Sequence, residues 1–245
     1  MIRNAADDRP VAVDAPESSP PPASVRIIGH GISRAVARFP GTWPLFRGLT
    51  RSFFDRVAPI WDTRTSSPDR MAPLDAALEL ASVTPQRILD LGTGTGAAAI
   101  WLAERFPEAS IVGVDLAPRM IQAARERLPA QLVGRVKYEV ADAAARLPFA
   151  DAEFDLVTQV SVSAFCAETA RVIEPGGTLV VVSSRGPATP AHTPPHLLQR
   201  GFERKGLEWI GEGAAGVGTY YLLRKPSAFA RAPRQTRGGH GPAEE

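Results

Sequence analysis

The 245-residue sequence predicts an α/β fold whose doubly wound, mostly parallel sheet ends in an antiparallel hairpin. From residue 88 to residue 182, short apolar runs alternate with stretches of helical periodicity. This order is typical of a parallel sheet with helices on both faces. Two further apolar runs, residues 207–212 and 217–225, are joined by a short loop and therefore predict the hairpin. Seven strands in one sheet are expected.

A glycine-rich turn follows the first predicted strand. Ile88, Leu89 and Leu91 form an apolar run suited to the centre of a parallel sheet, and glycines follow at positions 92, 94 and 96. Glycine permits positive φ and close approach of the backbone to a ligand. The helix expected from Ala97 would present unpaired N–H groups and its positive dipole end to that ligand. This order of elements indicates a nucleotide-binding site.

Acidic residues follow the next two predicted strands. The run at residues 110–114 ends in Asp115, at about the distance from the glycines where a ribose-binding acid is expected. The alternating run at residues 136–140 precedes Asp142. Ligands of such sheets bind at the carboxyl ends of the strands, where both acids would lie.

The second half of the sheet is expected to continue this alternation. Residues 154–160 predict the fourth strand, residues 164–173 a helix, and residues 178–182 the fifth strand after a turn at residues 174–177. The short passage from residue 159 to residue 165 leaves little room for substrate contacts. A proline-rich loop follows the fifth strand, and a helix is expected from His196 to Phe202.

Residues 25–84 are expected to form an N-terminal helical lid, and residues 85–225 the core of the same domain. Apolar residues recur at helical spacing in two segments of the lid. These residues are Ile28, Ile32, Val36 and Phe39, then Leu45, Leu49, Phe53 and Val57.

A third lid helix is expected to begin with Ser67 as its N-cap and Pro68 at its first position. The proline-rich ends of the chain, residues 1–24 and 226–245, show no periodicity and are expected to be disordered tails.

Composition excludes several classes of protein. The single cysteine, Cys166, rules out an internal disulfide framework and is expected to be a buried thiol on a helix. No segment reaches the ~18 apolar residues of a membrane span. Asp7 and Asp8 lie where a signal peptide needs an apolar run, so a cytoplasmic protein is expected. The formal net charge of +2 gives no reason to expect a nucleic-acid partner.

The charge is unevenly distributed along the chain. Between residues 26 and 70, eight arginines stand against three aspartates. A solvated helix face explains such a pattern, and contact with an anionic acceptor or a peripheral membrane surface is the alternative.

Several segments together resemble the class I S-adenosylmethionine-dependent methyltransferases that act on small molecules, of the ubiquinone/menaquinone-biosynthesis type. The matching segments are ILDLGTGTG, VGVDLAPRMI, the Asp142-Ala143 step, LPFADAEFDLV and RVIEPGGTLVVV. The resemblance implies a Rossmann-like core, S-adenosylmethionine as cofactor and methyl transfer to a small acceptor. In that family the glycine turn holds the adenosyl and methionine portions, and the acids after the second and third strands take the ribose and the adenine.

Carried onto this sequence, the resemblance implies a set of cofactor-binding residues around the glycine turn and the strand ends. They are Asp90, Gly92, Thr93, Gly94, Gly96, Asp115, Leu116, Met120, Asp142, Ala143 and Gln159. The lead-in at residues 53–62 also resembles the family, with Trp61 in place of the usual tyrosine. Trp61 is either close to the cofactor or a packing aromatic between lid and core.

No protein base is evident from the sequence. His192 and His196, on the loop after the fifth strand, are the candidates with a suitable pKa, and an exposed loop histidine is the competing interpretation. The four histidines are scattered without carboxylates at ligand spacing, so no metal site is expected. Transfer is therefore expected to depend on proximity and orientation, with an acceptor that is already nucleophilic.

Other functions stay open at this stage. The chain could bind S-adenosylmethionine without transferring a methyl group. Tyr221 and Lys225 have the spacing of a short-chain reductase pair, but on a strand they would lie about 13 Å apart, too far to share one substrate atom. The segment after the fourth strand, residues 159–162, lacks the tetrad of enzymes that methylate DNA bases.

Overall fold

The computed structural model describes residues 21–62 and 68–227. The predicted tails therefore lie outside the described residues, except for residues 21–24 and 226–227. The predicted N-cap Ser67 also lies outside them. No helix within the described ranges is long and apolar enough to cross a membrane.

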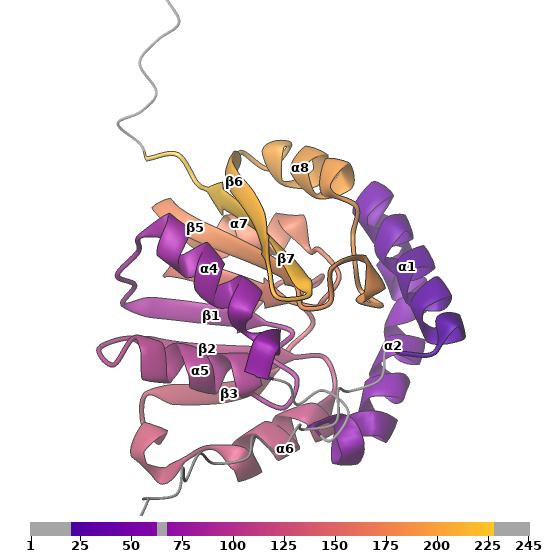
Figure 1. Cartoon of the computed structure of the whole chain (residues 1–245), viewed down its shortest axis with the longest axis horizontal. Coiled ribbons are helices and arrows are strands. Elements are labelled where there is room, and N and C mark those ends of the chain that lie inside the picture. The colour runs from indigo at the N-terminus through magenta and orange to yellow at the C-terminus, as the bar shows by residue number, and fades with distance from the viewer. Residues whose placement is uncertain (1–20, 63–67, 228–245) are drawn as a thin grey trace, which may run out of the picture.

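Seven strands form one sheet in the order β3-β2-β1-β4-β5-β7-β6 (Figure 1). β1 to β5 pair in parallel, and β7 pairs antiparallel with both β5 and β6. The predicted fold class and its terminal hairpin are thus confirmed. The strands are β1 (Arg87–Leu91), β2 (Ser110–Asp115), β3 (Val136–Val140), β4 (Phe154–Val160), β5 (Ile173–Ser183), β6 (Glu208–Ala215) and β7 (Gly218–Arg224).

Alternate residues of the central strands face two apolar layers. Ile88 of β1 belongs to one core cluster together with residues of α4 (Ala72–Ala81) and α5 (Ala97–Arg105). Leu89, the next residue, belongs to the other, together with residues of α7 (Cys166–Val172) and α8 (Pro195–Glu203). Because successive side chains of a strand point to opposite faces, this pattern explains the uninterrupted apolar runs.

The predicted turn at residues 174–177 is instead part of β5. The pairing of β4 with β5 shifts between Phe154 and Leu156, so that extra residues of β5 form an irregularity in the ladder. Gly176 has φ 90° and donates its N–H to the carbonyl of Lys225. The predicted start of this strand, residue 178, is five residues later than the observed start, because a Pro-Gly-Gly segment is normally a turn signal.

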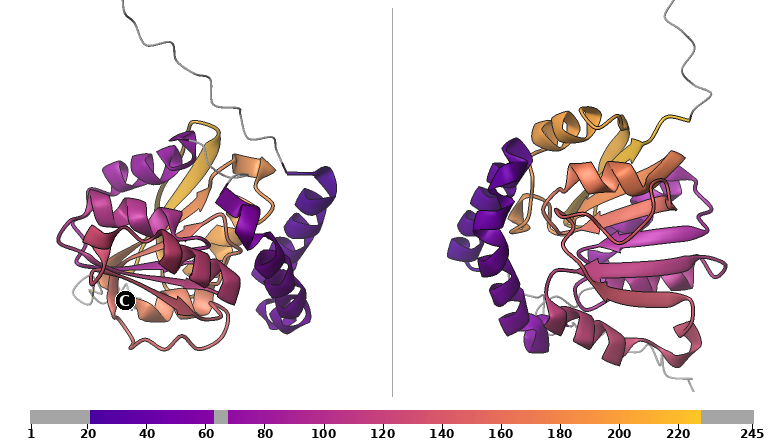
Figure 2. Two further views of the ribbon diagram at one scale, coloured as in Figure 1. Left: turned by 90° about the horizontal axis from the view of Figure 1, so that it is seen from below. Right: turned by 180° about the vertical axis from the view of Figure 1, so that it is seen from behind.

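The N-terminal helices α1 (Ala23–Arg38) and α2 (Trp43–Val57) form a wall beside the sheet (Figures 1 and 2). α1 begins two residues earlier than expected. Val36 and Trp43 are buried against the core, and Ala58 is buried in a small cluster with α6 (Pro118–Arg127). These inward contacts fix the wall over the carboxyl ends of the strands.

The expected extent of the lid differs from the structure. The helix expected from Ser67 begins at Ala72, after a 3₁₀ turn at Pro68–Arg70, and packs on the sheet as α4 rather than forming part of the lid. The lid is therefore shorter than residues 25–84. In α2, Leu45 and Leu49 are 79% and 62% exposed, so this part of the apolar stripe faces outward, whereas Val57 at its end packs against the cluster around Ala58.

Candidate functional site

A pocket opens where the order of the strands reverses. β2 and β4 lie on either side of β1, so their following helices leave to opposite faces and a crevice remains at the strands' carboxyl ends. Its walls come from the glycine turn, the ends of β2 to β4, and the lid. The lining residues are Trp43, Thr50, Phe54, Trp61, Arg70, Met71, Gly92–Thr95, Ala97, Ala98, Val114–Leu116, Met120, Ala141–Ala143, Val160–Ser163, Phe165 and Ala191.

The glycine turn brings bare backbone to the pocket. Gly92 and Gly94 have φ values of 76° and 56°, a region that disfavours side chains other than glycine. A Cβ at Gly92 would lie 2.7 Å from Val162 Cγ2, whereas one at Gly94 would meet only Trp61, at 3.8 Å. Gly92 is thus required for packing beneath the turn, and Gly94 presents open backbone to a ligand.

Gly96, predicted at the cofactor, has a packing role in the structure. It is the N-cap of α5, with φ 83°, and does not line the pocket. Its carbonyl accepts a hydrogen bond from the Tyr138 hydroxyl, and a Cβ there would collide with that side chain. Gly96 therefore permits α5 to approach β3.

Asp115 lies at the end of β2 with its carboxylate in the pocket. One carboxylate oxygen accepts the N–H of Gly94 at 3.0 Å and the other that of Ala117 at 2.8 Å. Burial raises the pKa of Asp115 to about 6, and these two hydrogen bonds oppose the rise. Each oxygen keeps a further lone pair, so the carboxylate can still accept two donors from a ligand.

Asp142 joins the pocket to the lid. The indole N–H of Trp43 lies 2.9 and 3.0 Å from the two oxygens of Asp142, and the Arg47 guanidinium lies 3.6 Å from one of them. The N–H of Ala144 donates to the same carboxylate. A ligand that binds Asp142 must therefore share this carboxylate with the lid.

Asp90 and Gln159, both expected at the cofactor, lie beneath the pocket instead. Asp90 is fully buried and accepts a hydrogen bond from Thr158 at 2.7 Å, and burial raises its pKa. Its second oxygen has no hydrogen-bond partner in the described part of the chain. The Gln159 amide donates to Thr169 and links β4 to α7. Neither side chain lines the pocket.

The other predicted cofactor residues do come together. Six of them line the pocket alongside Asp115 and Asp142, and they come from the glycine turn, the end of β2, α6 and the segment after β3. They are Gly92, Thr93, Gly94, Leu116, Met120 and Ala143.

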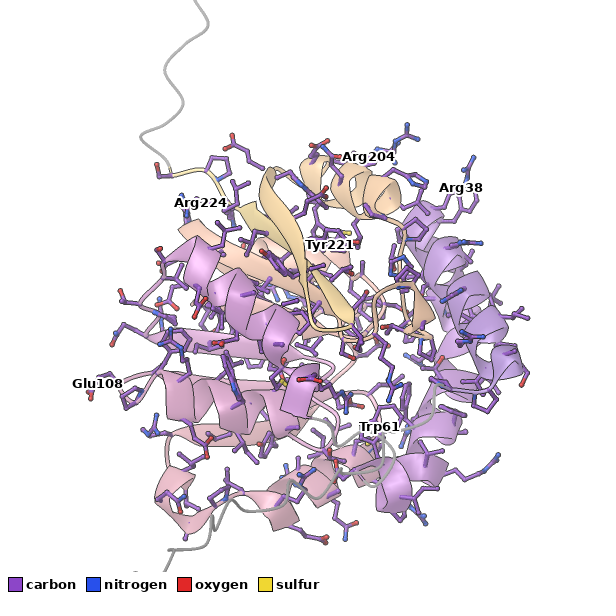
Figure 3. All side chains as sticks on the ribbon, in the orientation of Figure 1. Arg38, Trp61, Glu108, Arg204, Tyr221 and Arg224 are labelled. Atoms are coloured by element: carbon purple, nitrogen blue, oxygen red, sulfur yellow. The ribbon has the colours of Figure 1, made fainter. Side chains whose placement is uncertain are left out.

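Trp61 could be either close to the cofactor or a packing aromatic between lid and core, and its position is compatible with both. It lines the pocket and packs edge to face on Phe54 of α2, with ring centroids 5.5 Å apart. In Figure 3 it lies between the lid helix and the carboxyl ends of the strands. Trp61 is therefore a packing residue and a wall of the pocket at once.

Arg70 brings a half-buried positive charge to the same wall. Burial, and then the nearby Arg185, lower its pKa to about 10, while Asp62 opposes this shift. Its guanidinium lies 5.9 Å from the centre of the Trp61 ring. An arginine remains charged at this pKa, so this end of the pocket suits a carboxylate.

The sequence predicts a lid over the site but does not identify most of the lid and β4 residues that line the pocket. Trp43, Thr50, Phe54, Arg70 and Phe165 lie far from the glycine motif in sequence, and no local pattern marks them as ligand residues. The segment Ser161–Ser163 lines the pocket although its shortness argued against substrate contacts. Its two serines bond to distant elements, Ser161 to Ser184 and Ser163 to Ser33 of the lid.

The candidate bases His192 and His196 are not pocket residues, although Ala191 next to His192 is one. His192 is half-buried, its Nδ1 lies 3.2 Å from the Ser183 hydroxyl, and burial followed by the charges of His30 and Arg34 lowers its pKa. His196 is exposed at the start of α8. Neither residue lines the pocket.

The reductase interpretation is not supported by the positions of its two residues. Tyr221 is buried in the core next to Trp209, with ring centroids 5.3 Å apart. The Lys225 ammonium donates to the carbonyls of Ala170 and Ile173 and thereby closes the end of α7. Both side chains have structural roles.

Comparison with known proteins agrees with this geometry. Residues 88–177 match the family model described as a methyltransferase domain. The chain is 37% identical over 150 residues to a demethylmenaquinone methyltransferase of Deinococcus radiodurans, a match that covers 57% of this chain and 61% of that protein. It is 37% identical over 197 residues to the ubiquinone/menaquinone biosynthesis C-methyltransferase UbiE of Syntrophotalea carbinolica. This match covers 74% of this chain and 79% of that protein.

A solved structure has the same fold. The S-adenosylmethionine-dependent methyltransferase of Aquifex aeolicus superposes with a TM-score of 0.57 at 17% identity, covering 68% of this chain and 98% of that one. Three observations lead to one assignment. They are the antiparallel β7 beside β5, the glycine turn at the point where the strand order reverses, and the match over 79% of a UbiE relative. The chain belongs to the class I S-adenosylmethionine-dependent methyltransferases of the ubiquinone/menaquinone-biosynthesis type.

Proposed function

We propose that this protein transfers the methyl group of S-adenosylmethionine to a reduced aromatic ring of the quinol class, whose ring carbon or oxygen is already nucleophilic. The observation that carries the proposal is the aromatic lining of the pocket, to which four aromatic side chains and no histidine contribute among the described residues. They are Trp43, Phe54, Trp61 and Phe165. The names of the quinone-methylating relatives support the same acceptor class.

The residues around the pocket fit the proposed cofactor. Asp115 retains free lone pairs for the two ribose hydroxyls, and Asp142 offers acceptors for the adenine amino group. Gly94 leaves the backbone open, and Arg70 supplies a charge for the carboxylate of the methionine portion. When bound, the cofactor would supply a sulfonium methyl group for in-line displacement, in which the bond from sulfur to methyl breaks as the bond to the acceptor forms, and the proton that the acceptor loses passes to the solvent.

The chain's own contribution would be alignment and exclusion of water. Well-oriented reactants can gain ~7 to 11 kcal/mol over a bimolecular encounter. The aromatic lining of the pocket holds a flat acceptor in place and keeps water out. Positive charge disperses during the transfer, so an apolar wall does not oppose it.

The experiment that tests this proposal is turnover with a short-chain naphthoquinol that lacks the ring methyl group. Formation of S-adenosylhomocysteine and a product heavier by one methyl group, located on the ring by fragmentation, is expected. The oxidised quinone is the matched control, because it lacks the nucleophilic ring and should give no product. Binding of S-adenosylhomocysteine without turnover of any quinol, phenol or amine would instead favour a binding protein that transfers nothing.

The pH dependence of cofactor binding follows from Asp115. The ribose hydroxyls donate to the ionised carboxylate, so affinity is present above the pKa of about 6 and is lost as the pH falls through it. At pH 5, one unit below that pKa, S-adenosylhomocysteine should bind up to about tenfold more weakly than at pH 7.5. Calorimetry across this range checks the expectation. The Asp115→Asn variant, which cannot ionise, should lose this dependence, and a parent profile that is flat to pH 5 would contradict it.

Substitution of either candidate base is expected to leave transfer almost unchanged. His192 and His196 do not line the pocket, so the rate constants of His192→Ala and His196→Ala should stay within about threefold of the parent, since a general base contributes ~100-fold or more. Single-turnover rates with saturating quinol measure this directly. A loss of ~100-fold in either variant, with its pH dependence near the histidine pKa removed, would show that a protein base takes part.

The proposed partners are a small-molecule acceptor and, through the lid, a membrane surface. A nucleic-acid substrate is not proposed, since the chain lacks the base-methylation tetrad after β4.

A further inference from the structure

The outer side of the lid gathers most of the exposed apolar side chains. Among the described residues, twelve large apolar side chains are exposed, and seven of them lie between residues 27 and 60. Single exposed apolar residues are ordinary, but a cluster on one element marks an interaction site. The seven are Ile27, Ile28, Phe39, Leu45, Leu49, Phe53 and Ile60.

Helical spacing places three of them on one side of α2, while Ile27 and Ile28 lie in α1 and Phe39 and Ile60 follow the ends of the two helices. Leu45, Leu49 and Phe53 are four residues apart and form a continuous stripe along α2. The opposite side of the wall carries Val36 and Trp43, which are 2% and 6% exposed against the core. The lid is thus apolar on both sides, and the core covers only one of them.

Arginines surround the outward apolar residues. From Ala23 to Val57 the two helices hold six arginines and one acid, Asp55. Asp55 pairs with Arg51 at 3.8 Å and also accepts the N–H of Arg119. Within residues 21–62 and 68–227, no acidic side chain forms an ion pair with Arg38 or Arg56.

This lid face is defined by the seven outward apolar residues between positions 27 and 60 together with the exposed Arg38, Arg51 and Arg56. Arg38 lies at the outer edge of the molecule and stacks near Phe39, 5.6 Å from the ring centre (Figure 3). An apolar stripe bordered by arginines is the composition of helices that lie in the interface of an anionic bilayer. Two copies of the face would bring arginines against arginines with only Asp55 to oppose them, which disfavours a symmetric dimer.

We propose that the lid face docks on the surface of an anionic lipid bilayer, with its leucine, isoleucine and phenylalanine side chains inserted among the acyl chains and its arginines at the phosphates. The two helices then stand between the bilayer and the pocket, because the inward side of α2 supplies Trp43, Thr50 and Phe54 to the pocket. Delivery of an acceptor with a lipid-soluble tail from the bilayer rests on the proposed function. The docking itself does not.

The test is co-sedimentation of the full chain with vesicles of phosphatidylcholine alone and with vesicles that also contain phosphatidylglycerol. Binding is expected on the anionic vesicles, with an affinity that falls as salt rises. An arginine near such a surface contributes about fivefold in affinity, so Arg38→Gln/Arg56→Gln should bind anionic vesicles about 25-fold more weakly. Leu45→Ser/Leu49→Ser should lose binding at every lipid composition.

Matched controls come from exposed residues elsewhere. Val133→Ser/Val217→Ser removes side chains that are 68% and 69% exposed, and Arg204→Gln/Arg224→Gln removes two exposed charges outside the lid, after α8 and at the end of β7 (Figure 3). Both double variants should bind vesicles like the parent. Thermal unfolding should be unchanged in all four, since every substituted side chain is exposed.

Three outcomes would overturn the proposal. The first is that the parent binds neutral and anionic vesicles equally well. The second is that the lid variants bind anionic vesicles as well as the control variants do. The third is a dimer in solution that Leu45→Ser/Leu49→Ser dissociates, which would make the lid face an interface between copies. Turnover of a short-chain, water-soluble quinol separates the two proposals. This turnover should be retained in the lid variants. If the parent binds vesicles normally but shows no turnover, that result would count against the proposed function alone.

Discussion

Replacing Asp115 by alanine is expected to weaken binding of S-adenosylhomocysteine at least about a hundredfold at pH 7.5. Two ribose hydroxyls would donate to this one carboxylate, and hydrogen bonds to charged groups contribute ~1.5 to 3 kcal/mol each. The corresponding change at Asp142 should cost less, about tenfold. That carboxylate is already shared with Trp43, Arg47 and Ala144, so its free acceptor capacity is smaller.

Asp155 provides the control for this experiment. Like Asp115, it accepts backbone N–H groups, those of Gln86 and Arg87, at 2.8 and 3.1 Å, but it lies outside the pocket. Asp155→Ala therefore reproduces the loss of two backbone hydrogen bonds without removing a ligand contact. Calorimetry together with circular dichroism compares the variants. Unchanged affinity in a folded Asp115→Ala protein, or an equal loss in Asp155→Ala, would remove Asp115 from the site.

Replacing Gly92 by alanine is expected to abolish measurable cofactor binding and to lower the free energy of unfolding by several kcal/mol. The positive φ costs ~1 to 3 kcal/mol for a residue with a side chain. The added Cβ would also lie 2.7 Å from Val162, closer than atoms can approach, so the turn must move. A displaced turn no longer presents its backbone to the pocket.

The Gly134→Ala variant distinguishes the cost of positive φ from the cost of the steric clash with Val162. Gly134 also has positive φ, 97°, but a Cβ there would meet nothing within 4 Å, so this variant should lose only the strain energy and keep its cofactor affinity. Adding Val162→Ala to Gly92→Ala removes the obstructing side chain and should restore part of the stability, which a double-mutant cycle measures. Equal unfolding midpoints for the Gly92 and Gly134 variants would show that contact with Val162 is unimportant.

The sequence determined the succession of strands and helices along the chain and the part of the site that adjoins the strands. Each parallel strand carries an apolar run followed by a turn residue or acid, and such local patterns depend only on neighbouring residues. That is why Gly92, Gly94, Asp115 and Asp142 could be placed at one edge of the sheet. The antiparallel hairpin was also predictable, because a short loop leaves two adjacent strands no other arrangement.

Tertiary structure alone decided which side of the lid faces the pocket. α1 and α2 are apolar on two sides, so periodicity cannot tell the buried stripe from the exposed one, and most of the predicted stripe of α2 faces outward. Asp90, Gly96 and Gln159 show the same limit within the core. Each adjoins a motif in sequence, but the pleat of the strand or the contact between α5 and Tyr138 turns it away from the pocket. The contact of Trp43 with Asp142 joins positions 99 residues apart, and only packing of the lid on the sheet brings them together.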